Sequence, residues 1–351
     1  MSKTLEDSQE KRLSHVLLSI GAPIVGCLIG LVIGAFLILL ANADPLSAYQ
    51  TMFKGAFGSQ RQFTETVLKA GPLLLIALGL TTAFRAKIWN IGAEGQYYMG
   101  ALFGGVVALY LTDLPRPLLI TVMLLAAVVG GMIWGWIPAM LKVKTGMNEI
   151  ISTLMLNYIA ILLMEYLARG PLQEPGGYLP MSAQFDRVTR LPLLFGTRVH
   201  LGVLITLVLV PIIYVLLWST PLGFRVRAVG SRASVARYAG VQVEKIIIFV
   251  LVLSGGIAGL AGIIEVATLH TRLKSGISQG YGFSAILVAL LGRMNPVGVT
   301  VAAIFFAALI IGSEAMHVVY GLPVSLADAI QAIIVLSVLA VDALVRRRMN
   351  A

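Results

Sequence analysis

The stretch Ile246-Ile-Ile-Phe-Val-Leu-Val-Leu-Ser-Gly-Gly-Ile-Ala-Gly-Leu-Ala-Gly-Ile-Ile-Glu-Val-Ala-Thr-Leu269 decides the fold class of this chain. It runs for 24 residues with Glu265 as its only charged side chain, and about 20 mainly apolar residues suffice to cross a bilayer as a helix. Its glycines at 255, 259 and 262 share one helix face, which lets a neighbouring helix approach closely. An N-terminal run predicts the same kind of contact through Gly26, Gly30 and Gly34.

Similar runs recur along the chain and predict an all-α, polytopic membrane protein with about ten transmembrane helices. The run Phe283–Leu291 is too short to span alone, so we expect a half-helix or a re-entrant segment there. The first run precedes Ala41-Asn42-Ala43, which resembles a signal-peptidase site. A signal core has only about 7–15 residues, so this longer run is interpreted as a retained helix. The candidates are Val16–Leu40, Val67–Phe84, Asn90–Leu111, Leu118–Leu141, Ile150–Leu167, Val199–Trp218, Ile246–Leu269, Phe283–Leu291, Val297–Tyr320 and Val324–Val345.

The composition excludes a soluble domain. Hydrophobic residues make up 58% of the 351 residues and charged residues 12%, against about 25% charged in soluble domains. The single cysteine, Cys27, excludes an internal disulfide framework, and no Cys/His cluster has zinc spacing. The net charge of +10 is interpreted as a topology signal, because no basic patch interleaved with aromatic residues indicates nucleic-acid binding.

Basic residues concentrate at one set of span ends, which the positive-inside rule assigns to the cytoplasm. With an even number of crossings, both termini are cytoplasmic. We therefore predict a cytoplasmic tail at residues 1–15, a transmembrane domain at 16–345 and a basic cytoplasmic tail at 346–351. Within the domain, the Pro- and Gly-rich stretch 170–198 is an extracytoplasmic loop, and 219–245 is the largest cytoplasmic segment.

That cytoplasmic segment contains small residues with arginines between them. The pattern predicts a short helix that Ser231 caps and Gly240 ends, with a smooth ridge at Ala233, Ala236 and Ala239 that fits a groove in a partner protein. The alternative is a solvated basic loop that topology alone places there.

Polar residues interrupt the beginning of two spans. Asn90, Glu94 and Gln96 lie at or inside the start of one, where a charged side chain is costly and indicates function. The alternative for Glu94 is a helix cap or an ion pair with Arg85 or Lys87.

The second interrupted span begins at Asn148, with Ser152 on the same predicted helix face and Asn157 and Tyr158 deeper. These residues are candidates either for a solute pathway or for interhelical hydrogen bonds. No pair among the other buried-span acids and histidines has catalytic geometry; these are Glu165, Glu265, His270, Glu314, His317 and Asp328.

The sequence Leu253-Ser-Gly-Gly256 resembles the start of the signature of ATP-binding cassettes, but it continues inside an apolar span. The chain also lacks a G-x-x-x-x-G-K-[ST] loop. We therefore expect no ATP hydrolysis by this chain.

Three motifs together are similar to those of ABC-importer permeases of the branched-chain amino acid, ribose and nucleoside type, and most like nucleoside and simple-sugar permeases. They are Trp89-Asn-Ile-Gly-Ala-Glu-Gly-Gln96, Asn148-Glu-Ile-Ile-Ser-Thr-Leu-Met-Leu-Asn-Tyr158, and Leu222-Gly-Phe-Arg-Val-Arg-Ala-Val-Gly230 with Ala239-Gly240. The similarity runs from the second span to the last.

The resemblance implies a permease subunit in the bacterial inner membrane, without a cofactor or metal. Its partners would be two cytoplasmic ATP-binding cassette ATPases, a second permease that is often a different chain, and an extracytoplasmic solute-binding protein. It implies that the segment with Asn90, Glu94 and Gln96 lies near the central pathway, while Asn148, Ser152, Asn157 and Tyr158 stay pathway candidates on their own residue types. It also implies ATPase coupling through Gly223, Arg225, Arg227, Gly230, Arg232, Ala233, Ala236, Arg237, Ala239 and Gly240.

One alternative belongs to another class. An ion-coupled secondary transporter working alone would need intramembrane carboxylates to carry a proton or Na⁺, and Glu94, Glu265 and Glu314 are the candidates. A cytoplasmic segment shaped for docking has no purpose in that alternative.

Overall fold

The computed structural model describes residue 21 and residues 24–349, except 195 and 322. The predicted tail at 1–15, the start of the first span and the last two residues of the basic tail lie outside the described residues. Regular structure in the described part is helical, apart from three isolated β-bridges. The predicted all-α class is therefore confirmed.

Seven helices of the described residues are long and apolar enough to cross a membrane. They would be eight if the helix Ile24–Leu40 and α2 (Pro45–Phe57), bent by 115°, form one span. The seven are α3 (Gln60–Arg85), α5 (Arg116–Thr145), α6 (Glu149–Arg169), α7 (Leu201–Ser219), α10 (Val243–Glu265) with the π-helical turn Val266–His270, α12 (Pro296–Tyr320) and α13 (Val324–Met349).

Two further apolar helices of the described residues belong neither to these seven nor to the bent pair. They are α4 (Ala93–Tyr110) and α11 (Tyr281–Leu291), and α11 has only 11 residues. The expectation of a short helix near 283–291 is confirmed. In the described residues the structure thus supports seven or eight candidate spans, whereas hydropathy predicted about ten for the whole chain.

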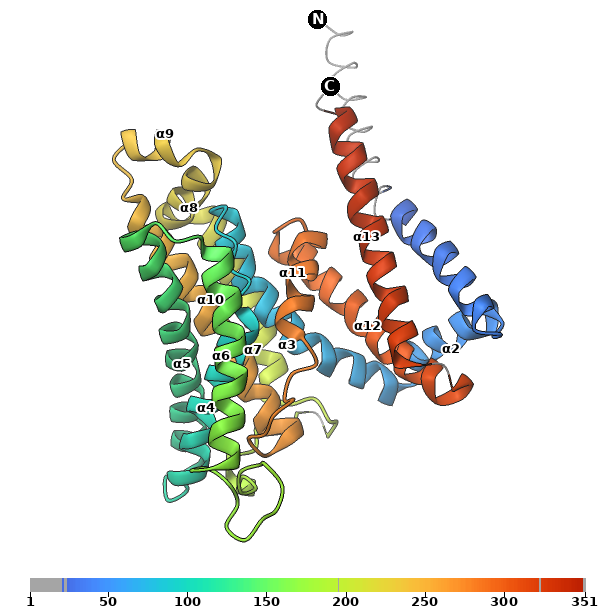
Figure 1. Ribbon diagram of the computed structural model, residues 1–351, viewed down its shortest axis with the longest axis horizontal. Coiled ribbons are helices and arrows are strands. Elements are labelled where there is room, and N and C mark those ends of the chain that lie inside the picture. The colour runs from blue at the N-terminus through green and yellow to red at the C-terminus, as the bar shows by residue number, and fades with distance from the viewer. Residues whose placement is uncertain (1–20, 22–23, 195, 322, 350–351) are drawn as a thin grey trace, which may run out of the picture. The chain divides into compact units, whose positions relative to one another are not determined.

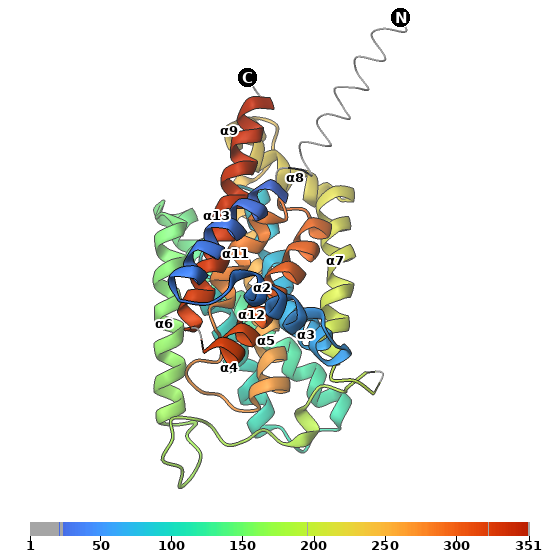
Figure 2. The same cartoon turned by 90° about the vertical axis from the view of Figure 1, so that its right-hand side faces the viewer.

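The helices form two compact units, which are described separately. Unit 1 contains the described residues up to Thr66 and those from Phe305 onward. In it the helix Ile24–Leu40 packs against α13 (Figure 2). A Cβ at Gly26 or Gly30 would overlap backbone atoms of α13, so the close contact predicted for these glycines is confirmed.

Unit 2 spans Val67–Ile304, and α10 lies at its centre, packed on α4 and α5 (Figure 1). A Cβ at Gly259 would overlap backbone of α5, and one at Gly262 would overlap the Tyr97 carbonyl of α4. These glycines let three helices approach at backbone distance, as the sequence predicts.

The backbone between α3 and α4 is not helical from Ala86 to Gly92. Lys87 has a positive φ of 57°, which ends α3, and α4 begins only after Gly92. The predicted span at Asn90–Leu111 is therefore an irregular segment followed by a helix of 18 residues. Buried irregular backbone requires hydrogen-bond partners within the protein.

The segment after α7 forms two helices where one was predicted. They are α8 (Pro221–Ser231) and α9 (Ala233–Tyr238), and both lie at the opposite end of unit 2 from the 170–200 segment (Figures 1 and 2). The expectation that Ser231 caps the short helix of this segment is wrong, because Ser231 ends α8 and Arg232 precedes α9. Gly240, with φ of 81°, ends the segment as expected.

Candidate functional site

Asn90 joins the irregular segment to α4 and α10. Its amide nitrogen donates to Gln96 Oε1 at 2.9 Å and to Ser254 Oγ at 3.0 Å. Its amide oxygen accepts from Gly92 N at 3.0 Å and from Gln96 Nε2 at 3.2 Å. Asn90 is fully buried and Gln96 nearly so. The two amides therefore satisfy each other inside the bundle, which removes most of their desolvation cost.

Asn157 of α6 holds the same segment from the other side. Its side-chain oxygen accepts from Gly95 N at 2.8 Å, and its side-chain nitrogen donates to Ile91 O at 2.8 Å. Thr153, one turn earlier, accepts from Ile91 N at 3.2 Å. Side chains of α6 thus replace the backbone partners that a continuous helix would provide.

Glu94 connects the beginnings of two helices. It lies in the first turn of α4, and its Oε2 accepts from Gly282 N, in the first turn of α11, at 2.7 Å. The side chain is buried. Glu94 therefore acts as a helix cap, one of the alternatives that the sequence offered. The helix it caps is α11, which the sequence did not specify. Arg85, one of the expected ion partners, instead binds carbonyls that follow α11.

The remaining pathway candidates lie in different surroundings. Asn148 is exposed and caps α6 by accepting from Ile150 N at 2.8 Å. Ser152 is buried and donates to Glu149 O. Tyr158 is 58% exposed. Asn148 and Ser152 therefore do not meet at one polar surface, although helical spacing places them on neighbouring turns.

A second polar cluster was not recognised in the sequence as a candidate site. Lys69 of α3 donates to Gln279 Oε1 at 2.7 Å and lies 5.2 Å from the centroid of the Tyr281 ring. The Tyr281 hydroxyl lies 3.1 Å from Glu265 Oε1. Lys69 is half-buried and Gln279 exposed. The signal available in the sequence was a lysine inside the predicted span Val67–Phe84.

The predicted coupling residues divide into an exposed and a buried set. In α9, Ala236 is only 4% exposed and packs against its own chain, whereas Tyr238, which is not one of the predicted residues, is 94% exposed. Arg237 forms an ion pair with Glu244 at the start of α10. The other exposed members are Arg225, Arg232, Ala233, Ala239 and Gly240, and the buried ones are Gly223 and Gly230.

Arg227 differs from the other arginines of α8. Its side chain is half-buried, and its Nη1 is a buried donor with no hydrogen-bond partner in the described structure. Such a group is uncommon and calls for an explanation.

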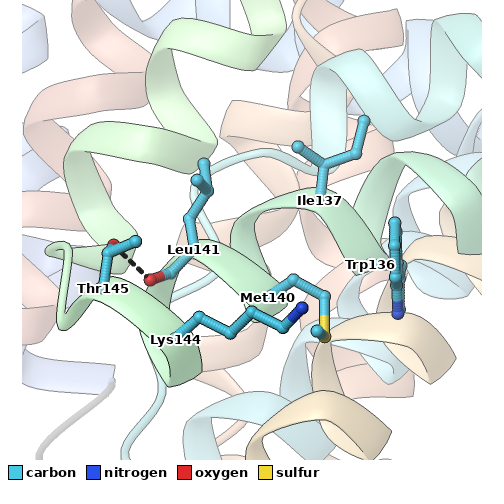
Figure 3. Close-up of a pocket in the computed structure, with 6 residues that line it drawn as sticks. All are labelled: Trp136, Ile137, Met140, Leu141, Lys144 and Thr145. Carbon is cyan, nitrogen blue, oxygen red and sulfur yellow. Dashed lines mark hydrogen bonds between the residues drawn. The ribbon is translucent and has the colours of Figure 1, made fainter.

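An apolar hollow of about 220 Å³ lies on one face of α5 (Figure 3). Trp136, Ile137, Met140, Leu141, Lys144 and Thr145 line it. The only hydrogen bond drawn among them runs from Thr145 Oγ1 to Leu141 O of the same helix (Figure 3). The hollow offers a polar solute almost no partners. Nor do any three His, Cys, Asp or Glu side chains of the described residues form a group that could hold a metal ion.

Comparison with known proteins extends over almost the whole chain. A glucose ABC transporter permease protein of Haloferax volcanii is 40% identical over 330 residues, which is 91% of this chain and 87% of that protein. A guanosine ABC transporter permease protein of Bacillus subtilis is 34% identical over 335 residues, 93% of this chain and 94% of its own. A second guanosine permease protein of B. subtilis is 27% identical over 69% of this chain and 78% of its own length.

No solved structure matches this chain. The family described as the permease component of the branched-chain amino acid transport system matches residues 62–339. This range runs from the beginning of α3 into α13 and includes the buried cluster around Asn90, the cluster around Lys69 and the α8–α9 segment. The chain is therefore a multi-pass membrane protein that belongs to this family of ABC transporter permeases.

Proposed function

We propose that this chain is the permease subunit of an ATP-driven importer whose solute is a nucleoside or a simple sugar. The observation that carries the proposal is the identity of 40% and 34% to permeases named for glucose and guanosine, each over about nine-tenths of the chain. The two named solutes share a hydroxylated sugar ring, so the pathway must offer hydrogen-bond partners to hydroxyl groups.

Energy is supplied by two cytoplasmic ATPase subunits that dock at α8 and α9. Exposed Arg225, Arg232 and Tyr238 surround this end of unit 2, and the chain has no phosphate-binding loop of its own. A solute-binding protein meets the 170–198 loop at the opposite end. The second permease is a different, related chain, which is supported by the two B. subtilis guanosine permeases that match with unequal identity.

The helices α4 and α11 also lie within the membrane and bring the number of transmembrane elements to ten, with both termini in the cytoplasm. The contact between Glu94 and Gly282 supports this arrangement, because it joins the N-termini of α4 and α11 in the buried part of unit 2. Two interrupted helices that meet inside a bundle are typical of transporter sites.

The pathway wall is formed by the segment Asn90–Gln96 and by α6 from Asn148 to Tyr158. The buried amides of Asn90, Gln96 and Asn157 hold the wall in shape, while Lys69 and Gln279 are placed to contact solute. A charged side chain that faced lipid within a span would be costly. The partial exposure of Lys69 in α3 therefore favours an aqueous surface over a lipid-facing one.

The test is uptake of labelled guanosine and glucose by the complete transporter in proteoliposomes. Uptake that requires ATP and the partner ATPases is expected, and uptake driven by an ion gradient with this chain alone would refute the proposal. Lys69→Met is expected to lower uptake about tenfold, equivalent to about 1.4 kcal/mol. Lys144→Met, which changes a lysine beside the apolar hollow of α5, is the control and should transport normally.

ATPase docking is tested separately with Ala233→Trp. Ala233 is exposed on α9, so the added ring should block a partner without disturbing the packing of this chain. A bulky substitution of Ala236 would disturb that packing, because Ala236 is buried. We expect loss of ATPase co-purification, whereas Tyr166→Trp on exposed α6 surface should retain it. Normal co-purification of Ala233→Trp would contradict docking at α9.

A further inference from the structure

Arg85, the last residue of α3, binds the turn that follows α11. Its Nε donates to Met294 O at 2.9 Å and its Nη2 to Arg293 O at 3.3 Å. Arg293 and Met294 both have positive φ, at 54° and 53°. The planar guanidinium thus contacts two carbonyls at the C-terminal end of α11, where a positive charge is favourable for the helix dipole.

The other end of α11 is bound by the same stretch of chain. Glu94 Oε2 accepts from Gly282 N at 2.7 Å, and a carboxylate is favourable at a helix N-terminus. A segment of ten residues, Arg85–Glu94, therefore contacts both ends of α11 with charges of the matching sign. Among the other described helices, α11 packs mainly on α4, which continues directly from this segment.

The cytoplasmic helix α8 contacts this segment at Arg85. A Cβ at Gly230 of α8 would overlap the Arg85 carbonyl oxygen and lie 3.1 Å from Ala86 Cα, so the two backbones are in direct contact. The Arg85 guanidinium carbon also lies 4.9 Å from the centroid of the Trp218 ring, which is in the last turn of α7 before α8.

The middle of the segment has a different set of partners. Asn90 is bound to Gln96 and Ser254, and Ile91 is bound by Asn157. These bonds tie residues 90–92 to α6 and α10, whereas the close contact with Gly230 of α8 lies at Arg85 and Ala86. A displacement of α8 therefore acts at Arg85 and Ala86, and through the Arg85 guanidinium on the two carbonyls of the turn that follows α11.

We propose that Arg85 is the positioning residue that transmits movement of α8 to α11, so that the nucleotide state of the partner ATPases sets the position of this half-helix. The proposal rests on the function proposed above, since it requires ATPases that move α8. Close packing at Gly230 and a two-carbonyl contact at Arg85 form a continuous physical connection between the two elements.

The experiment follows α11 directly in the complete transporter. Cys27, the only cysteine, is replaced by Ser, and Phe283, which is 41% exposed on α11, is replaced by Cys. The modification rate of this cysteine by a water-soluble maleimide is measured without nucleotide and after trapping with ATP and vanadate. With Arg85 present we expect the two rates to differ by about fivefold or more, the usual lower range of coupling between sites.

The substitution Arg85→Gln should abolish this difference while the ATPases still co-purify. Arg85→Lys retains the charge but cannot bind two carbonyls as a fork, so it should reduce the difference between the two modification rates. It replaces Arg85→Gln as the test variant if the Gln variant does not assemble. Arg169→Gln, which removes an exposed ion pair with Glu165 on α6, is the control and should behave as the parent protein.

The outcomes separate this inference from the proposed function. A nucleotide-dependent rate difference that persists in both Arg85 variants overturns the role of Arg85, as does a parent protein with no difference despite ATP-driven uptake. Uptake that needs no ATP in the parent protein overturns the proposed function itself. Loss of the difference in the Arg85 variants, with ATP-driven uptake in the parent, supports both.

Discussion

At the residue scale, the buried amide of Asn157 is expected to contribute to stability through two hydrogen bonds to the irregular segment. Asn157→Leu leaves Gly95 N–H and Ile91 C=O without a partner, at a cost of about 1–3 kcal/mol per unsatisfied group. Thermal unfolding of the purified transporter should show a lower Tm. Thr121→Val, at an exposed hydroxyl bonded within its own helix, should leave Tm nearly unchanged. Equal Tm values for both variants would contradict this role of Asn157.

A second residue-scale prediction concerns pH. His200 precedes α7, and its Nδ1 accepts from Gly202 N at 3.1 Å. Burial lowers its pKa to about 4, from 6.5. Between these values the unfolded chain binds more protons, so the stabilising contribution is complete above pH 6.5 and is lost as the pH falls towards 4.

We therefore expect a larger fall in Tm from pH 7.5 to pH 5 for the parent protein than for His200→Asn. Asparagine keeps a capping oxygen but does not titrate. An identical pH dependence of the two proteins would show that His200 does not contribute.

The polar residues of the interrupted spans could be found in the sequence, because amides and acids in apolar runs are conspicuous. Their roles could not be assigned. Asn90 finds Ser254 across 164 residues, and Glu94 finds Gly282 across 188. Helical spacing describes one helix only, so it cannot distinguish a pathway residue from one bonded to a distant helix.

At the element scale, the glycine face of α10 is expected to control the packing of unit 2. Gly259→Ala introduces a methyl group that overlaps α5 backbone, and overpacking costs about 1–3 kcal/mol. Gly71→Ala in α3 meets no atom within 4 Å and should be neutral or stabilising by up to about 1 kcal/mol. Thermal unfolding of the two variants compares them directly, and a Gly259→Ala protein as stable as Gly71→Ala would exclude tight packing at this face.

The elements themselves were predicted to different degrees. Glycine spacing and apolar length correctly indicated the helix contacts and the short helix near residue 283. The segment 219–245 was predicted to contain one short helix, but the chain is extended at Arg232, with φ of −156°, and the segment forms two helices, α8 and α9. Helix propensity over so few residues is a weak guide, because tertiary contacts such as that between Gly230 and Arg85 override it.

At the scale of the whole molecule, topology is the prediction to test. With ten transmembrane elements, a fluorescent reporter that folds only in the cytoplasm should be active at either terminus. A reporter active only outside the cytoplasm should be active in the 170–198 loop. A silent cytoplasmic reporter at the C-terminus would contradict the proposal that α4 and α11 are both among the ten transmembrane elements.

The sequence alone determined that this chain is an all-helical membrane protein and resembles ABC permeases. Hydropathy suffices for the class, since transfer into lipid depends on the side chains of one continuous run. The tertiary structure decided that the Gly-lined run Ile246–Leu269 lies at the centre of unit 2, and that Arg85 and Glu94 bind the two ends of α11. Those contacts join residues 188 and 209 positions apart. Such pairs form only when separate helices pack, and their geometry is absent from any single stretch of sequence.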